Sequence, residues 1–268
     1  MGLLALNDGR SMPQLGLGTW GLFADHGVAS IRQALEIGYE LVDTAAFYGN
    51  EATVGDGARA TGAWITTKLW NDRHGDPAAA LDESLSRLGL DAVDLYLSHG
   101  PSLARGRYID AWRSMVDLRD AGRARSIGVS NFSPEHLEAI VEATGVTPAV
   151  NQIELHPRFQ QRAAREYHVR HGIVTQSWSP LGQGRELLAD PAIARIADQH
   201  ECSAAQVVIA WHLAHDLGVI PKASGRAHLA DNFAAQQLTL EPAEMAAIDA
   251  LDSPGGRLGA DPRTSPFC

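Results

Sequence analysis

The sequence predicts an α/β fold, a (β/α)8 TIM barrel, and three observations carry this prediction. Short apolar or β-branched runs, typical of buried parallel strands, alternate with stretches whose apolar residues recur at helical spacing. Eight such strand-then-helix units follow one another along the chain. The length of 268 residues is close to the roughly 250 residues typical of such a barrel. No long linker or low-complexity tract interrupts the alternation, so we expect one domain over residues 1–268.

The N-terminal segment precedes the alternating units. Asp8-Gly9 lies between two short extended pieces, and this dipeptide in that setting is a hairpin signal. We expect the hairpin to close the bottom of the barrel. Extra helices are expected near the C-terminus, beyond the last strand.

The remaining elements follow from the two periodicities. Strands are expected at residues 15–18, 41–42, 64–67, 93–98, 126–129, 149–152, 173–176 and 219–220. Helices are expected at residues 28–37, 51–60, 77–88, 109–121, 134–142, 163–171, 191–199, 204–215, 228–235 and 242–251. Asp76 and Pro77 mark one helix start. Asn50 as a cap and Glu51 in the first turn mark another.

A doubly wound open sheet is the alternative fold, because it also alternates strands with helices. Such a sheet usually carries a glycine-rich dinucleotide fingerprint after its first strand. Residues 15–20 lack the third glycine of that fingerprint, and no helix follows them immediately. The barrel is therefore favoured.

The composition excludes several classes of protein. The formal net charge is −10, and no Lys/Arg-rich block is present, which argues against a nucleic-acid-binding protein. No uncharged apolar run reaches the roughly 18 residues of a membrane span. The N-terminus lacks the basic start and long apolar core of a signal peptide. Cys202 and Cys268 form no disulfide framework, so we expect a reducing, cytoplasmic location.

Ionisable residues follow three neighbouring predicted strands. Asp43, Lys68 and His99 each come directly after an apolar or β-branched run, and Tyr48 lies on the loop after Asp43. In a barrel the C-terminal strand ends meet at one mouth, where catalytic residues collect. Taken singly, Asp43 could brace a loop, His99 could be a structural histidine, and Tyr48 could be packing. Lysine at a buried strand end is rarely tolerated unpaired, and the joint placement favours a functional site.

These four residue types suit proton transfer. A free phenol has a pKa of about 10 and is a poor acid at neutral pH. A buried cation would stabilise its anion, and a carboxylate could hold that cation in place. A metal-dependent hydrolase would need more clustered ligands than Asp43 and His99 supply, so we expect no metal.

The motifs along nearly the whole chain resemble those of the aldo-keto reductase superfamily, most closely the bacterial branch typified by 2,5-diketo-D-gluconate reductases. They are Asp43-Thr44-Ala45-Ala46-Phe47-Tyr48-Gly49-Asn50-Glu51, Thr66-Thr67-Lys68-Leu69-Trp70-Asn71-Asp72-Arg73-His74, Asp94-Leu95-Tyr96-Leu97-Ser98-His99, Gly128-Val129-Ser130-Asn131-Phe132, Asn151-Gln152-Ile153-Glu154-Leu155-His156-Pro157 and Trp178-Ser179-Pro180-Leu181-Gly182-Gln183-Gly184.

The resemblance implies a function for the four strand-end residues. Asp43, Tyr48, Lys68 and His99 match the catalytic tetrad of an NAD(P)H-dependent reductase that converts aldehydes and ketones to alcohols. The nicotinamide would supply hydride, Tyr48 the proton, and His99 would orient the carbonyl. Diketo sugar acids, α-keto esters, 2-oxoaldehydes and simple aldehydes all remain open as substrates. A non-catalytic cofactor-binding redox sensor or accessory subunit on the same fold is the alternative.

The resemblance also implies a cofactor site. Ser130, Asn131 and Gln152 match residues that hold the nicotinamide carboxamide, and Trp178 matches the aromatic residue that stacks on the ring. The full set implied is Gly18, Thr19, Ser130, Asn131, Gln152, Trp178, Ser179, Leu181, Gly182, Lys222, Ala223, Ser224, His228, Asp231 and Asn232. The candidate substrate pocket is formed by Trp20, Phe47, Trp70, Gly100 and Phe132.

Four departures from the family pattern carry their own expectations. His228 stands where an arginine usually binds the 2′-phosphate, so we expect NADPH as cofactor with NADH also accepted. Gly100 replaces a tryptophan, which should widen the pocket. The connection at residues 60–64 is short, on the far face of the barrel. The tail after Asp252 is short, which should leave the site open. Relatives of this branch are often monomers, and we expect a monomer here.

Overall fold

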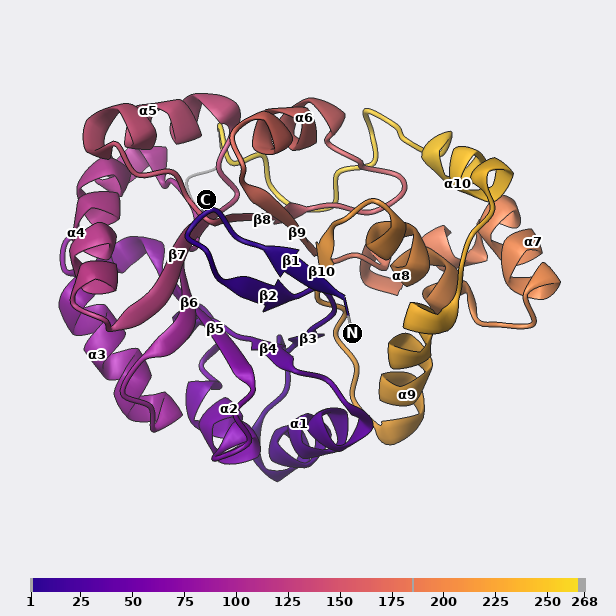
Figure 1. The fold of residues 1–268 in the computed structure, drawn as a ribbon, viewed down its shortest axis with the longest axis horizontal. Helices are drawn as coiled ribbons and strands as arrows, with labels where there is room; N and C mark the ends of the chain where they lie inside the picture. The colour runs from indigo at the N-terminus through magenta and orange to yellow at the C-terminus, as the bar shows by residue number, and fades with distance from the viewer. Residues whose placement is uncertain (1, 185, 265–268) are drawn as a thin grey trace.

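A closed barrel of parallel strands surrounded by helices is the architecture of the chain (Figure 1). The structure, a computed structural model, describes residues 2–184 and 186–264; Cys268 lies outside them. The eight barrel strands are β3 (Leu17–Gly18), β4 (Leu41–Asp43), β5 (Trp64–Leu69), β6 (Val93–Ser98), β7 (Ala124–Ser130), β8 (Val150–Glu154), β9 (Val174–Trp178) and β10 (Gly218–Val219). Parallel bridges from Leu15 to Val219 and from Gly18 to Lys222 join the first strand to the last. The predicted (β/α)8 barrel is confirmed.

The helices lie at the predicted positions, with ends that shift by a few residues. They are α1 (Ala24–Ile37), α2 (Glu51–Ala58), α3 (Pro77–Leu88), α4 (Tyr108–Asp120), α5 (Pro134–Thr144), α6 (Arg162–Arg170), α7 (Pro191–Gln199), α8 (Ala204–Ala214), α9 (Arg226–Ala234) and α10 (Pro242–Asp249). No helix in the described ranges combines the length and the apolar character that crossing a bilayer would require.

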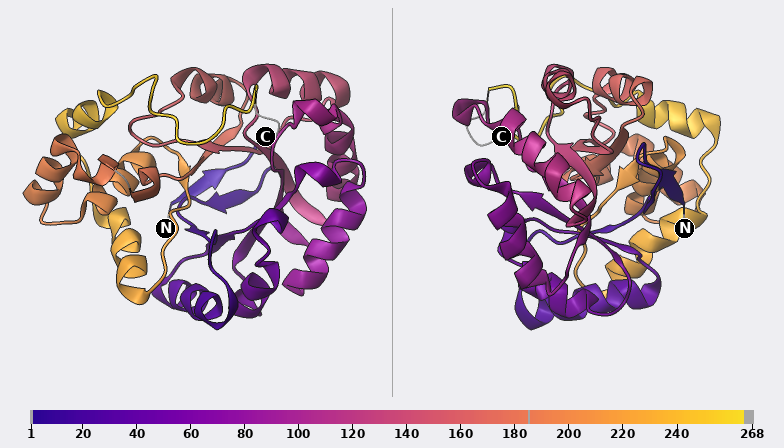
Figure 2. Two further views of the ribbon diagram at one scale, coloured as in Figure 1. Left: turned by 180° about the vertical axis from the view of Figure 1, so that it is seen from behind. Right: turned by 60° about the vertical axis from the view of Figure 1, so that its left-hand side comes forward.

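The N-terminal hairpin covers one end of the barrel. Strands β1 (Leu3–Ala5) and β2 (Ser11–Pro13) pair antiparallel, and Met12 on β2 is fully buried among Leu41, Leu97 and other side chains of the barrel interior. The C-terminal tail lies at the opposite end of the barrel from this hairpin (Figure 2). The predicted closure of the bottom by the hairpin is confirmed, and the other end is left for the strand-end residues.

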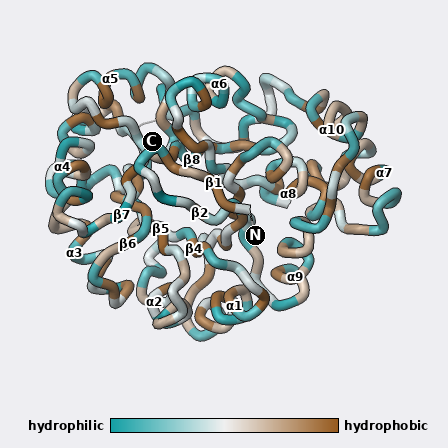
Figure 3. Tube along the Cα trace, in the orientation of Figure 1, coloured by the Kyte–Doolittle hydropathy of each residue, from teal (hydrophilic) through white to brown (hydrophobic). Residues whose placement is uncertain are grey.

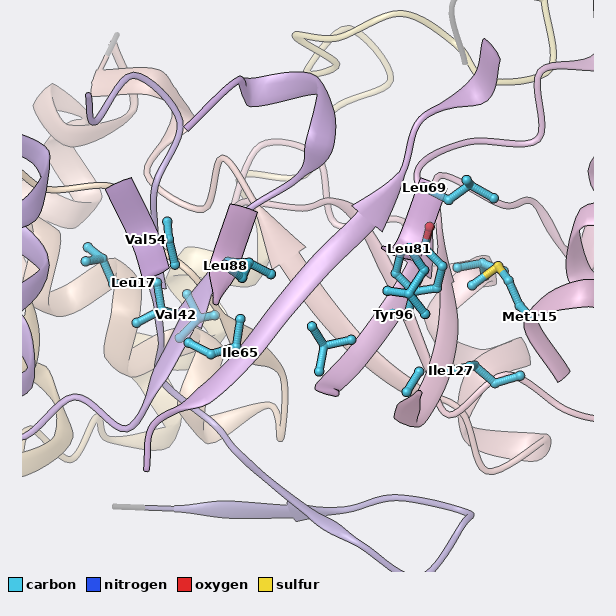
Figure 4. Close-up of a cluster of buried hydrophobic side chains, with 14 of the residues drawn as sticks. Leu17, Val42, Val54, Ile65, Leu69, Leu81, Leu88, Tyr96, Met115 and Ile127 are labelled. Atoms are coloured by element: carbon cyan, nitrogen blue, oxygen red, sulfur yellow. The ribbon is translucent and has the colours of Figure 1, made fainter. Parts of the chain in front are cut away.

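The main core lies between the strands and the surrounding helices (Figure 4). Val42 and Ile65 of adjacent strands belong to it together with Val54 of α2 and Leu88 of α3. Hydrophobic segments follow the strands and the inner helix faces, while the outer faces are more hydrophilic (Figure 3). Burying one such side chain contributes about 1.5–3 kcal/mol, so this layer holds the strand ends in fixed positions.

The short connection at residues 60–64 leaves the sheet register intact. Helix α2 ends at Ala58, earlier than predicted, and Ala60 and Gly62 then turn the chain with φ of 57° and 74°. Strand β5 pairs with β4 so that Thr66 faces Asp43. The shortening is absorbed at the end of the helix, and Lys68 keeps its position at the C-terminal end of β5.

Candidate active site

Asp43 and Lys68 meet at the C-terminal ends of β4 and β5. The Lys68 ammonium donates to Asp43 Oδ1 at 2.5 Å and to the Thr44 carbonyl oxygen at 2.8 Å. Both side chains are buried. A buried ammonium is costly unless it is paired and hydrogen-bonded, and this geometry supplies both.

Tyr48 ends a short 3-10 turn, Ala46–Tyr48, after β4. Its hydroxyl lies 3.4 Å from the Lys68 ammonium, which also sits 5.0 Å from the centre of the phenol ring. Gly49 ends the turn with φ of 69°, a conformation that glycine adopts without strain. The phenol and the ammonium therefore face one another as predicted.

His99 follows β6 and completes the cluster. Its backbone N–H donates to the Leu69 carbonyl oxygen at 3.0 Å. Its ring meets the Tyr48 ring edge-on at 5.8 Å and the Trp70 ring at 5.0 Å, measured between centroids. Within the described residues, His99 Nδ1 is buried without a hydrogen-bond partner. The structure thus brings all four predicted strand-end residues together.

The electrostatics of the cluster favour one protonation pattern. Burial lowers the pKa of Lys68, but Asp43 and Tyr48 more than offset this, and the lysine stays charged. Burial, with a contribution from Lys68, puts the pKa of His99 well below its ordinary value, so the ring is neutral. Burial raises the pKa of Tyr48, and the opposing effect of Lys68 does not cancel it. Lys68 thus lowers the phenol pKa as a buried cation should, but burial outweighs it, and the phenol is held protonated.

A polar cradle lies beside the cluster on β7 and β8. Gln152 Nε2 donates to Asp43 Oδ2 and to Gln176 Oε1, each at 2.7 Å. Both N–H bonds of this amide are used, so its oxygen is the atom left for a ligand. Ser130 Oγ donates to the Gln152 carbonyl oxygen at 2.8 Å. These groups fit a nicotinamide carboxamide.

Asn131 connects the cradle to Trp178 and His99. Trp178 Nε1 donates to Asn131 Oδ1 at 2.8 Å, and Asn131 Nδ2 donates to the His99 carbonyl oxygen at 3.0 Å. Asn131 holds this position with φ of 63°, a conformation uncommon for residues other than glycine. Trp178, at the end of β9, is thereby held at its Nε1. Its indole fits the role of the surface on which the nicotinamide ring stacks.

Two further loops expected to contact the cofactor lie at the same end of the barrel. A Cβ at Gly18 would lie 2.7 Å from the Ile220 carbonyl oxygen, so only glycine fits where β3 meets the last strand. Thr19 Oγ1 donates to the Asp43 carbonyl oxygen at 2.9 Å. After β9 the chain turns through Ser179 and Gly182, with φ of 49° and 61°, around Leu181.

The cofactor-binding residues expected between Lys222 and Asn232, which include His228 near the 2′-phosphate, divide into exposed and buried parts. Lys222 and His228 are exposed, while Ala223 is buried and Ser224 is partly buried. Asp231 accepts from Ser203 Oγ and Gln206 Nε2 at 2.6 Å each, so it anchors the start of α8. Asn232 beside it is buried. Arg226 in this segment is exposed too, but its guanidinium pairs with Glu36.

An aromatic wall lines the mouth above the cluster. The Phe47 ring stacks between Trp70, at 3.9 Å, and Trp20, at 5.9 Å. Trp20 and Phe47 are half exposed, whereas Gly100 is buried. Phe132 does not join this wall, because its buried ring packs against Tyr108 and His136.

Sequence reasoning assigned Asn50 to the wrong role. Its side chain makes no helix cap. Instead it donates to the carbonyl oxygens of Thr19 and Leu22 and accepts from the Thr44 hydroxyl. Asn50 ties the loop after β3 to the loop after β4, and only the folded structure brings those carbonyls within reach.

Two buried carboxylates were missed. Glu51 accepts from Thr67 Oγ1 at 2.5 Å and from Arg87 Nε at 2.7 Å. Glu154 accepts from the backbone N–H groups of Leu258 and Gly259. The Asn-Gln-Ile-Glu motif around Glu154 was a signal for that residue. The short tail therefore does not leave the site fully open, because it lies against the end of β8. No cluster of metal ligands occurs among the described residues.

Comparisons with known proteins agree with this geometry. The Aldo/keto reductase family model matches residues 14–253. An aldo-keto reductase of Mycolicibacterium smegmatis is 46% identical over 98% of both chains. Methylglyoxal reductase DkgA of Salmonella typhimurium is 46% identical over 97% of this chain and 96% of its own.

Solved structures match equally well. Gox0644 without ligand is 47% identical with a TM-score of 0.95, covering 98% of each chain. A variant of Gox0644 in complex with NADPH gives a TM-score of 0.96 at 46% identity, again covering 98% of each chain. The non-catalytic alternative gains no support from these relatives. The chain therefore belongs to the aldo/keto reductase family and is an NAD(P)H-dependent carbonyl reductase.

Proposed function

We propose that this reductase uses NADPH to convert small 2-oxoaldehydes, with methylglyoxal as the first candidate, to hydroxy carbonyl compounds. Relatives named methylglyoxal reductase match this chain over nearly its whole length. The observation that carries the proposal is the contact of Tyr48 with the buried Lys68–Asp43 pair, with His99 beside the phenol. The mouth above is lined by half-exposed aromatic rings, which suits a small carbonyl compound.

The roles of the side chains follow from their charge states. Bound NADPH supplies the hydride that adds to the carbonyl carbon. The neutral His99 ring donates a hydrogen bond that orients the carbonyl oxygen. Tyr48 gives its proton to that oxygen as negative charge develops, and the product is an alcohol. Lys68 stabilises the phenolate left behind, and Asp43 keeps Lys68 charged and in place.

The cofactor would lie along the strand ends from β7 to β10. Gln152 and Ser130 would bind the carboxamide, Trp178 would stack on the ring, and Lys222 would meet the 2′-phosphate. An exposed lysine and His228 bind that phosphate less firmly than a bidentate arginine would. NADH is therefore included as a second cofactor, used more weakly than NADPH. The proposal also includes a single domain, a monomeric state and a cytoplasmic location.

A substrate panel tests this function. The decay of the nicotinamide absorbance should be followed with methylglyoxal, a diketo sugar acid, an α-keto ester and a simple aldehyde. Methylglyoxal should be turned over with the highest kcat/KM, and faster with NADPH than with NADH. A higher kcat/KM for the sugar acid or the keto ester than for methylglyoxal would make that compound's class the substrate class in place of 2-oxoaldehydes. Turnover of no compound in the panel would contradict the function.

A further inference from the structure

Glu154 is a buried carboxylate whose two oxygens hold the C-terminal tail. Glu154 Oε1 accepts from the Leu258 N–H at 2.5 Å, and Oε2 accepts from the Gly259 N–H at 2.8 Å. His156 Nε2 lies 3.4 Å from Oε1. Among the described residues, no lysine or arginine forms an ion pair with Glu154. A buried carboxylate without a cation depends on such N–H donors, so the tail and Glu154 stabilise one another.

The clamped part of the tail contacts the indole of Trp178. A Cβ at Gly259 would lie 2.8 Å from Trp178 Cη2 and 2.9 Å from Glu154 Oε2, so the Gly259 backbone packs directly on both. The indole is also held by the bond from its Nε1 to Asn131 Oδ1. Trp178 is therefore held at two points, at Nε1 by the barrel and at its six-membered ring by the tail.

The clamp is connected to the reacting atoms through Trp178 and Asn131. Asn131, which holds Trp178, also donates to the His99 carbonyl oxygen. A shift of the indole would disturb the stacking surface first and the His99 loop second. The hydrogen bonds from His156, Leu258 and Gly259 hold the pKa of Glu154 below its ordinary value although burial raises it, so the clamp is charged at neutral pH.

We propose that Glu154 is a positioning residue, which clamps Leu258 and Gly259 onto Trp178 and so fixes the indole surface that receives the nicotinamide. The inference rests on the proposed role of Trp178. It makes the tail a wall of the cofactor site. By thermodynamic linkage, loosening the clamp weakens NADPH binding, and bound NADPH tightens the clamp by the same factor.

Limited proteolysis of the full chain tests the clamp without turnover. Trypsin cleaves after Arg257, directly before the clamped Leu258 N–H, and mass spectrometry identifies that cut. Glu154→Gln places an amide where one backbone N–H needs an acceptor, so cleavage should accelerate by roughly tenfold or more. NADPH should slow the cut in the wild-type chain. Glu186→Gln is the control, since that side chain is 89% exposed, and it should leave the rate unchanged.

A second pair of variants tests the contact between the tail and Trp178. These variants still test the proposal if Glu154→Gln fails to fold. Gly259→Ala forces a methyl group against Trp178, whereas Gly255→Ala in the same tail meets nothing closer than Ser253 Oγ at 3.9 Å. NADPH affinity, measured by quenching of tryptophan fluorescence, should fall by about tenfold in Gly259→Ala and Glu154→Gln. It should stay at the wild-type value in Gly255→Ala and Glu186→Gln.

The outcomes separate this inference from the proposed function. Faster cleavage with unchanged NADPH affinity would overturn the positioning role, and an unchanged cleavage rate would overturn the clamp. A wild-type chain that binds NADPH but reduces no carbonyl would reject the proposed function and leave the clamp standing.

Discussion

Lys68 and Asp43 form an ion pair that is closed to solvent, with the ammonium 2.5 Å from Asp43 Oδ1 and the two side chains 0% and 1% exposed. The pair follows from strand register, because Thr66 faces Asp43 and Lys68 lies two residues farther along β5. Removing one partner of such a pair leaves an uncompensated buried charge, which typically costs about 3–5 kcal/mol. Burial raises the pKa of Asp43, and Lys68 opposes that rise, so each of these two residues stabilises the charged form of the other.

The first prediction concerns Asp43→Asn and pH. The folded pKa of Lys68 is raised, so the stabilisation that its charge contributes is full below the unfolded pKa of about 10.4. It is lost only as pH rises through the folded value. Without Asp43, burial would lower the lysine pKa, and the reduction rate should decline as pH rises within the range where the wild type is constant. Asp110→Asn, in an exposed pair with Arg113, is the control. Superimposable pH profiles for Asp43→Asn and wild type would contradict the pairing role.

The second prediction concerns Glu51, which joins β5 to α3. Glu51→Gln weakens its bonds to Thr67 and Arg87, and the free energy of unfolding should fall by about 1–3 kcal/mol. Kinetics should be unchanged, because the residue touches none of the four strand-end groups. Glu83→Gln removes an exposed carboxylate that also pairs with Arg87 and should leave thermal unfolding unchanged. Equal stability of the two variants would show that burial of Glu51 does not matter.

The third prediction concerns cofactor preference. Lys222→Ala should raise KM for NADPH by roughly tenfold, because a charged contact to the 2′-phosphate is lost. KM for NADH should change little, since NADH has no such phosphate. Initial rates with both cofactors at saturating methylglyoxal provide the measurement, and Arg113→Ala serves as the exposed control. An equal rise for both cofactors would place Lys222 elsewhere on the cofactor.

The fourth prediction concerns the width of the pocket. Gly100 follows His99, whose ring contacts Trp70 and Phe47. An indole in Gly100→Trp should exclude bulky ketones and lower their kcat/KM by roughly tenfold or more, while methylglyoxal is retained. Competition between a bulky aryl ketone and methylglyoxal measures this selectivity. An unchanged ratio of kcat/KM values would remove Gly100 from the pocket wall.

The sequence was most informative where strand ends fix side chains. Asp43, Lys68 and His99 could be placed together because parallel strands of a barrel end at one face. The roles of Asp231 and Phe132 could not be read in that way, since each depends on partners distant in sequence: Ser203 and Gln206 for Asp231, and Tyr108 for Phe132.

The tail shows the same limit. The sequence shows that the tail is short, but the position of the tail depends on Glu154, about a hundred residues earlier in the chain. The direction of the Tyr48 pKa also depended on tertiary structure, because the degree of burial decides it.

Tyr48→Phe tests the central claim most directly. Single-turnover reduction of methylglyoxal should be slowed by about 10²–10⁴-fold, the usual contribution of a general acid, while the NADPH affinity measured by fluorescence stays at the wild-type value. A Tyr48→Phe variant that reduces methylglyoxal at the wild-type rate would contradict the assignment of Tyr48 as the proton donor.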